Sequence, residues 1–128
     1  MANIAEELKY TKSHEWVKEE DGLYAIGLSD FAQEELGDIV FVNLPVEGDS
    51  VTAGEAFADV ESVKAVADVY SPVAGVVAEV NEELMDNPAL VNEAPYDAWF
   101  IKVADVEGME DLMDAAAYAA HCEAEKED

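Results

Sequence analysis

The sequence contains a single cysteine, Cys122, and no long apolar run. A lone cysteine excludes an intramolecular disulfide and agrees with a reducing compartment. No stretch approaches the roughly 18 apolar residues that a membrane-spanning helix needs. Residues 1–8 also lack the basic start and the apolar core of a signal peptide. These absences predict a cytoplasmic protein that does not enter a membrane.

Positive charge is also scarce, since 6 basic residues, all of them lysines, stand against 31 acidic ones and give a formal net charge of -25. Such a surface repels phosphate and excludes nucleic acid as a partner. Like charges at this density weaken the compact state at ordinary ionic strength, whereas near 1 M salt the screening length falls to about 3 Å. The composition therefore indicates a halophilic protein from a salt-rich cytoplasm. An acidic surface that suits particular partners is the alternative.

The common signatures of catalysis and metal binding are missing as well. There is no glycine-rich phosphate loop and no dinucleotide fingerprint, and His14 and His121 lack a metal-ligand spacing with Cys122. His121 and Cys122 would project about 100° apart on a helix, which disfavours a shared metal. We expect no metal site and no catalytic residue, with Cys122 either packed as a small apolar side chain or free on the surface.

What the chain does contain is a series of apolar residues that alternate with other residues, the period-two pattern of half-buried strands. We expect strands over residues 13–18, 23–28, 39–44, 56–61, 66–70, 76–80 and 99–103. The apolar face of the 76–80 strand would consist of Val76, Ala78 and Val80. Turn chemistry in residues 71–75 predicts a further hairpin there.

Helical signals occur in two places. Ser29 is a good N-cap and Gly37 a good C-terminal residue, which predicts a short helix over residues 29–37. A second, C-terminal helix is expected over residues 108–123, where apolar residues recur at helical spacing. Between them, two X-Pro pairs in residues 84–96 favour a structured loop or single helical turns.

A chain of 128 residues can bury one hydrophobic core and is too short for two ordinary domains. We therefore expect residues 1–128 to form a single domain, and we expect a monomer. Because the period-two segments dominate the middle of the chain, the predicted fold is mainly β, with two facing antiparallel sheets and both helices outside them.

Lys64 lies where the chain reverses between two expected strands. A lysine at a turn is weak support for any function, because most exposed lysines are solvated charges. We nevertheless interpret Lys64 as a post-translationally modified residue because of the stretches around it, which are Gly48-Asp49-Ser50-Val51, Gly54-Glu55, Val60-Glu61-Ser62-Val63-Lys64-Ala65, Ser71-Pro72-Val73-Ala74-Gly75-Val76-Val77 and Val80-Asn81.

These stretches resemble the lipoyl and biotinyl carrier domains, in which a lysine at a hairpin tip bears the prosthetic group. Biotin carriers usually place methionine on both sides of that lysine, and acyltransferase carrier domains keep an Asp-Lys-Ala type of tip, whereas Val63 and Ala65 flank Lys64. The chain is most similar to the glycine cleavage H-protein family. That resemblance extends over nearly the whole chain through Ser13-His14-Glu15-Trp16, residues 26–33, residues 37–45 and Pro95-Tyr96-Asp97-Ala98-Trp99. It departs at the tail, which is rich in alanine where the family has a charged helix.

The resemblance implies a lipoyl-type barrel-sandwich hybrid with a carrier core at about residues 46–81 and with lipoate covalently attached to Lys64. It implies a carrier, not an enzyme. The carried aminomethyl group would pass from a pyridoxal-phosphate glycine decarboxylase to a tetrahydrofolate-dependent aminomethyltransferase. Dihydrolipoamide dehydrogenase would then reoxidise the arm, and a lipoate ligase or lipoyl transferase would attach it.

The resemblance also implies a pocket that shelters the loaded arm, and the matching positions are Ser13, Glu15 and Asp68. Strand alternation would put Ser13 and Glu15 on one face, and Asp68 about 13 Å along an extended strand from Lys64 and on the same face as it. The alternative is that Glu15 and Asp68 are ordinary surface charges.

Two other functions remain open from the sequence. One is an H-like carrier that relays lipoyl groups to other enzymes, and the other is an unmodified acidic interaction module in which Lys64 is only a turn residue. The mass of the intact protein from its own host distinguishes a modified carrier from the module.

Overall fold

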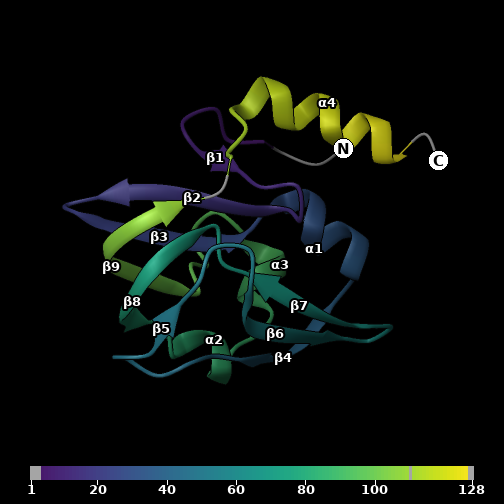
Figure 1. Ribbon diagram of the computed structural model, residues 1–128. Helices are drawn as coiled ribbons and strands as arrows, with labels where there is room; N and C mark the ends of the chain where they lie inside the picture. The colour runs from purple at the N-terminus through teal and green to yellow at the C-terminus, as the bar shows by residue number, and fades with distance from the viewer. Residues whose placement is uncertain (1–3, 110, 127–128) are drawn as a thin grey trace.

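The computed structural model describes residues 4–109 and 111–126 and consists of two packed antiparallel sheets (Figure 1). The 6-stranded sheet has the spatial order β1 (Lys9–Tyr10), β2 (Glu15–Glu20), β3 (Leu23–Leu28), β9 (Ile101–Met109), β8 (Val73–Val80) and β5 (Ser50–Val51). The 3-stranded sheet has the order β4 (Ile39–Asn43), β6 (Ala56–Ser62) and β7 (Val66–Tyr70). The predicted mainly β fold with two antiparallel sheets is confirmed.

The main core lies between the two sheets. Val60 and Val69 contribute from the small sheet, and Ile26, Val77 and Ile101 contribute from the large one; all five are buried. In β7 the buried Val69 lies between the exposed residues Asp68 and Tyr70, because successive strand side chains point to opposite faces. Burial on one face only leaves the other face of the β6–β7 hairpin open to solvent.

A second core holds the C-terminal helix α4 (Ala115–Lys126) against β1, as the top of Figure 1 shows. The ring of Tyr118 stacks on that of Tyr10 with a centroid separation of 4.2 Å. Cys122 packs in the same cluster as a small apolar side chain, which confirms one of the two interpretations of its role.

The short helix α1 (Asp30–Leu36) forms where its capping residues predict it. The Ser29 side chain accepts a hydrogen bond from the Ala32 backbone N–H, and Gly37 ends the helix with a φ of 82°. The segment with two X-Pro pairs forms the single turns α2 (Glu83–Asp86) and α3 (Leu90–Glu93), as predicted.

The prediction of a hairpin at residues 71–75 is wrong, because β7 and β8 belong to different sheets. Gly75 lies inside β8, where its backbone passes close to the Ala104 carbonyl. Register shifts between Ala74 and Val76 and between Val77 and Glu79 also change the phase of β8. Val77 is consequently the buried residue, while the expected inward residues Val76, Ala78 and Val80 are only partly buried.

The C-terminal helix begins seven residues later than the predicted residue 108, because residues up to Met109 extend β9. Met113 then exchanges two backbone hydrogen bonds with Tyr10, of 2.9 and 2.8 Å. The Asp114 side chain accepts a hydrogen bond from the Ala117 N–H and caps the helix that follows. Met109 and Met113 fit the helical spacing of the predicted helix, but pairing with distant strands determines their conformation.

Candidate functional site

The four residues 62–65 form the tip of the β6–β7 hairpin, as the strand pattern predicts for Lys64. The Ser62 N–H donates to the Ala65 carbonyl at 2.8 Å. The Ser62 hydroxyl oxygen accepts from the backbone N–H groups of Ala65 and Lys64, at 3.0 and 3.3 Å. These bonds satisfy the backbone of a tight turn and leave the Lys64 side chain exposed.

The tip rests on the carboxyl-terminal end of α1. The Val63 N–H donates to the Asp38 carbonyl at 3.0 Å. A methyl group at Gly37 would lie 3.6 Å from Cε of Lys64, so the lysine stem passes over this glycine. The Asn92 side chain binds the connection between α1 and β4. Its amide N–H donates to the Gly37 carbonyl, and its amide oxygen accepts from the Ile39 N–H. The hairpin and α1 accordingly extend on the same side of the molecule in Figure 1.

A cavity of about 180 Å³ lies between α1, β3 and this hairpin. Its apolar walls are formed by Leu28, Ala32, Leu36, Val60, Ala67 and Val69. Its polar lining consists of Ser13, His14, Glu35 and Asp68. The cavity therefore combines apolar walls with oxygen atoms that can bind a cation.

Glu15 is buried behind Ser13 and does not appear among the residues that line the cavity. Its Oε1 accepts hydrogen bonds of 2.6 Å from the hydroxyls of both Ser13 and Thr11, and its Oε2 accepts one of 3.2 Å from the Tyr70 N–H. Burial raises the pKa of Glu15 to about 7, while these donors act in the opposite direction. Glu15 thus joins the turn before β2 to β7, and it is not an ordinary surface charge.

The arrangement of the three predicted pocket residues differs from the expected one. β2 begins at Glu15, and His14 has a φ of 75°, so Ser13 lies in a turn and not on a shared strand face. Lys64 likewise lies in the tip and not on the same extended strand as Asp68. Ser13 and the exposed Asp68 nevertheless meet at the same cavity, and Glu15 supports Ser13 from behind.

His14 and Glu35 also line the cavity, and neither residue was predicted there from the sequence. Glu35 could have been found from helical spacing, because Ala32, Glu35 and Leu36 share one face of α1. No comparable signal exists for His14, whose direction depends on its left-handed backbone conformation.

Two packed antiparallel sheets with an exposed lysine at the tip of a β-hairpin are the architecture of a carrier domain. Within the described part of the chain, no carboxylate lies within ion-pairing distance of the Lys64 amine. An exposed amine at a tip, beside a cavity with apolar walls and a polar rim, fits a flexible covalent arm with a reactive end.

Comparison with known proteins identifies which carrier this is. The profile of the glycine cleavage H-protein family matches residues 8–125. Glycine cleavage system H proteins from Lachnoclostridium phytofermentans and Halalkalibacterium halodurans are 54% and 57% identical, over 97% and 92% of this chain and 98% and 94% of theirs. A crystal structure of the Mycobacterium marinum glycine cleavage system H protein has a TM-score of 0.86 and 37% identity, and covers 91% of this chain and 97% of that one. The chain belongs to the glycine cleavage H-protein family.

The protein is therefore a lipoyl carrier that shuttles the aminomethyl group in glycine cleavage, and it is a carrier component, not a catalyst. Proteins of this family carry lipoate covalently attached to a lysine. Among the helices described here, none is long and apolar enough to cross a membrane.

Proposed function

We propose that Lys64 is the lysine that bears the lipoyl group. Its position at an exposed, hydrogen-bonded tip supports this assignment, because a modifying enzyme can reach the amine without unfolding the hairpin. The amines of two other lysines have partners, since Lys18 pairs with Glu20 and Lys102 lies over the Trp99 ring. When attached, lipoate supplies a disulfide that two electrons reduce to a dithiol.

The cavity beneath the tip is proposed to shelter the carried aminomethyl group from water. Asp68 and Glu35 place carboxylates at the cavity, where a cationic amine needs a partner once it is partly desolvated. Ser13 offers a hydroxyl, and Glu15 keeps that hydroxyl in position through a 2.6 Å hydrogen bond. The apolar walls formed by α1 and the hairpin reduce the access of water to the same space.

We also propose the partners of the shuttle in detail. The family supports a glycine decarboxylase, an aminomethyltransferase and dihydrolipoamide dehydrogenase as successive partners, with a ligase or transferase that attaches lipoate. The net charge of -25 and the lone cysteine support a monomer in a reducing, salt-rich cytoplasm.

The test is glycine-dependent carboxyl exchange with the purified decarboxylase, for which Lys64→Arg and Lys18→Arg are compared with the wild type. Arginine keeps the charge but lacks the primary amine that forms the lipoyl amide. We expect Lys64→Arg to abolish exchange at an unchanged melting temperature, and Lys18→Arg to retain it. Exchange in Lys64→Arg would refute the assignment. A lipoylated wild type without any exchange would favour the lipoyl-relay carrier.

A further inference from the structure

Two histidines from opposite ends of the chain converge on one carboxylate. Nε2 of His14 lies 2.9 Å from Oε2 of Glu125, and Nε2 of His121 lies 2.6 Å from the same oxygen. His121 and Glu125 are four residues apart and share one face of α4, whereas His14 lies in the bend before β2. The ligand atoms of the three side chains all lie within 4.8 Å of one another.

The surroundings of His14 prepare one of its nitrogens for a ligand. Nδ1 lies 2.8 Å from the hydroxyl of Tyr118, which in turn lies 2.5 Å from Oγ of Ser29. A ring that donates from Nδ1 to Tyr118 presents a lone pair at Nε2 to the cluster.

The backbone offers a further donor at the same place. The Lys12 carbonyl oxygen lies 3.1 Å from Nε2 of His121. A tetrahedral metal ion needs four ligands. Here they would be two imidazole nitrogens, one carboxylate oxygen, and either this carbonyl oxygen or a water molecule. Tetrahedral zinc, with bonds of about 2.0 to 2.1 Å, places its ligand atoms about 3.3 Å apart. The Glu125 side chain is exposed, so its carboxylate can shift without displacing buried atoms when an ion enters the cluster.

We propose that His14, His121 and Glu125 form a binding site for a divalent transition metal, with Zn²⁺ as the ion that this nitrogen and oxygen set suits. The site is separate from Lys64 and does not rest on the proposed attachment of lipoate there. A bound ion would tie α4 to the bend that precedes β2. Because His14 also lines the cavity, the ion would fix one wall of that cavity.

The test titrates Zn²⁺ into the full-length protein by calorimetry, in molar potassium chloride with excess Mg²⁺ to suppress unspecific binding to the acidic surface. The arm is kept as the oxidised disulfide, and the titration is repeated in Lys64→Arg, because a free dithiol binds zinc by itself. The variants are His121→Ala and Glu125→Gln, with Glu123→Gln as the matched control. Glu123 is an exposed residue of the same helix, and its replacement makes the same charge change as Glu125→Gln.

We expect one zinc ion per chain, a melting temperature that rises with Zn²⁺, and ligand-field absorption bands when Co²⁺ replaces it. Removal of a ligand should weaken zinc binding by at least about tenfold and abolish the rise in melting temperature, whereas Glu123→Gln should behave as the wild type. Equal zinc affinity in His121→Ala, Glu125→Gln and the control would overturn the proposal, as would the absence of binding to the wild type. Because Glu125 is exposed, Glu125→Gln remains informative if His121→Ala does not fold.

Discussion

Glu15 carries a carboxyl group with 1% exposure beside the cavity, and its environment makes stability depend on pH. Burial raises the pKa of Glu15 from 4.5 to about 7, so the folded chain binds a proton that the unfolded chain has released between these pH values. The contribution of Glu15 to stability is fully present below pH 4.5 and is lost as the pH rises to about 7.

Comparison with Glu15→Gln isolates this effect from the many other acidic groups. The quantity of interest is the difference in unfolding free energy between the wild type and the variant. As the pH rises from 4.5 to about 7, this difference should decrease by up to about 1.4 kcal/mol per pH unit. Urea unfolding at constant molar salt measures the difference. Parallel pH profiles for the two chains would show that Glu15 does not titrate in this window.

Asp68 offers a test of the cavity that leaves the core intact, because its side chain is exposed at the rim. Asp68→Asn should shorten the half-life of the carried aminomethyl group by up to about fivefold, the effect of losing an exposed charge contact of up to 1 kcal/mol. Asp59→Asn is the matched control, since Asp59 is the cross-strand partner of Asp68 but does not line the cavity. Release of formaldehyde at molar salt gives the half-life. Equal half-lives for the two variants would remove Asp68 from the site.

At the scale of elements, Gly75 shows how tightly β8 and β9 pack. A methyl group at Gly75 would lie 2.5 Å from the Ala104 carbonyl oxygen, so the backbone must move to admit it. We expect Gly75→Ala to lower the unfolding free energy by about 1–3 kcal/mol. Gly108→Ala is the control, because Gly108 belongs to the same strand pair and has nothing within 4 Å of its methyl position. A loss of stability that is equal in both variants would contradict this account.

Local patterns predicted the elements whose structure depends on neighbouring residues. The period-two segments around Lys64 and the capping residues Ser29 and Gly37 gave the tip and α1 correctly. Residues 71–75 and 108–114 were mispredicted because their conformation depends on strands far away in the chain, as the bonds between Met113 and Tyr10 show. Tertiary pairing of this kind leaves no local signal.

In the candidate site too, local patterns predicted only the residues whose position depends on neighbouring residues in the chain. Lys64 follows from the hairpin pattern together with the family resemblance, and its exposure is confirmed. The burial of Glu15 and the meeting of His14 with Glu125 depend on where α4 and the turn before β2 pack. Sequence spacing could only have suggested the pair of His121 and Glu125, which are one helical turn apart.

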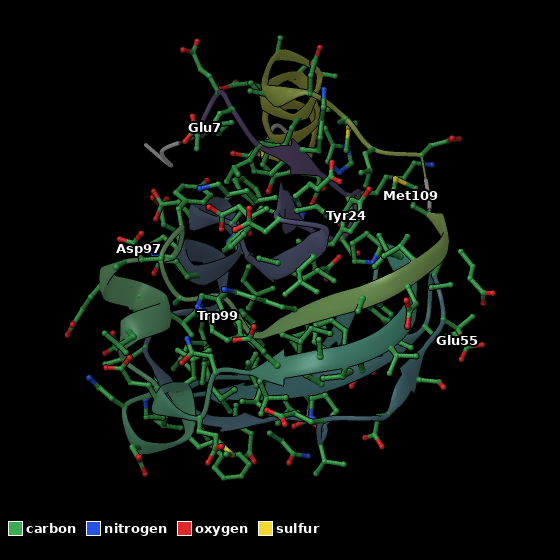
Figure 2. All side chains as sticks on the ribbon, turned by 90° about the vertical axis from the view of Figure 1, so that its left-hand side faces the viewer. Glu7, Tyr24, Glu55, Asp97, Trp99 and Met109 are labelled. Carbon is green, nitrogen blue, oxygen red and sulfur yellow. The ribbon has the colours of Figure 1, made fainter. Side chains whose placement is uncertain are left out.

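For the whole molecule, the dominant property is the net charge of -25. Acidic side chains such as Glu7, Glu55 and Asp97 point outward around the rim of Figure 2, and all three are exposed. Salt should relieve their mutual repulsion, so the melting temperature should rise between low and molar potassium chloride, by about 4 °C for each kcal/mol relieved. Sodium chloride should raise the melting temperature in the same way, because screening depends on ionic strength. A melting temperature that does not change with salt would leave the acidic composition without this explanation.

Peptide mass spectrometry of the protein purified from its own host shows whether Lys64 carries the lipoyl arm. The peptide that contains Lys64 should carry the mass of one lipoyl amide, and the peptides of the five other lysines should carry none. The tip supports this outcome because Ser62 holds the turn while the Lys64 side chain remains exposed. The assignment of the lipoyl group to Lys64 would be contradicted by protein that is active in glycine exchange while Lys64 is unmodified, or while the lipoyl group is on another lysine.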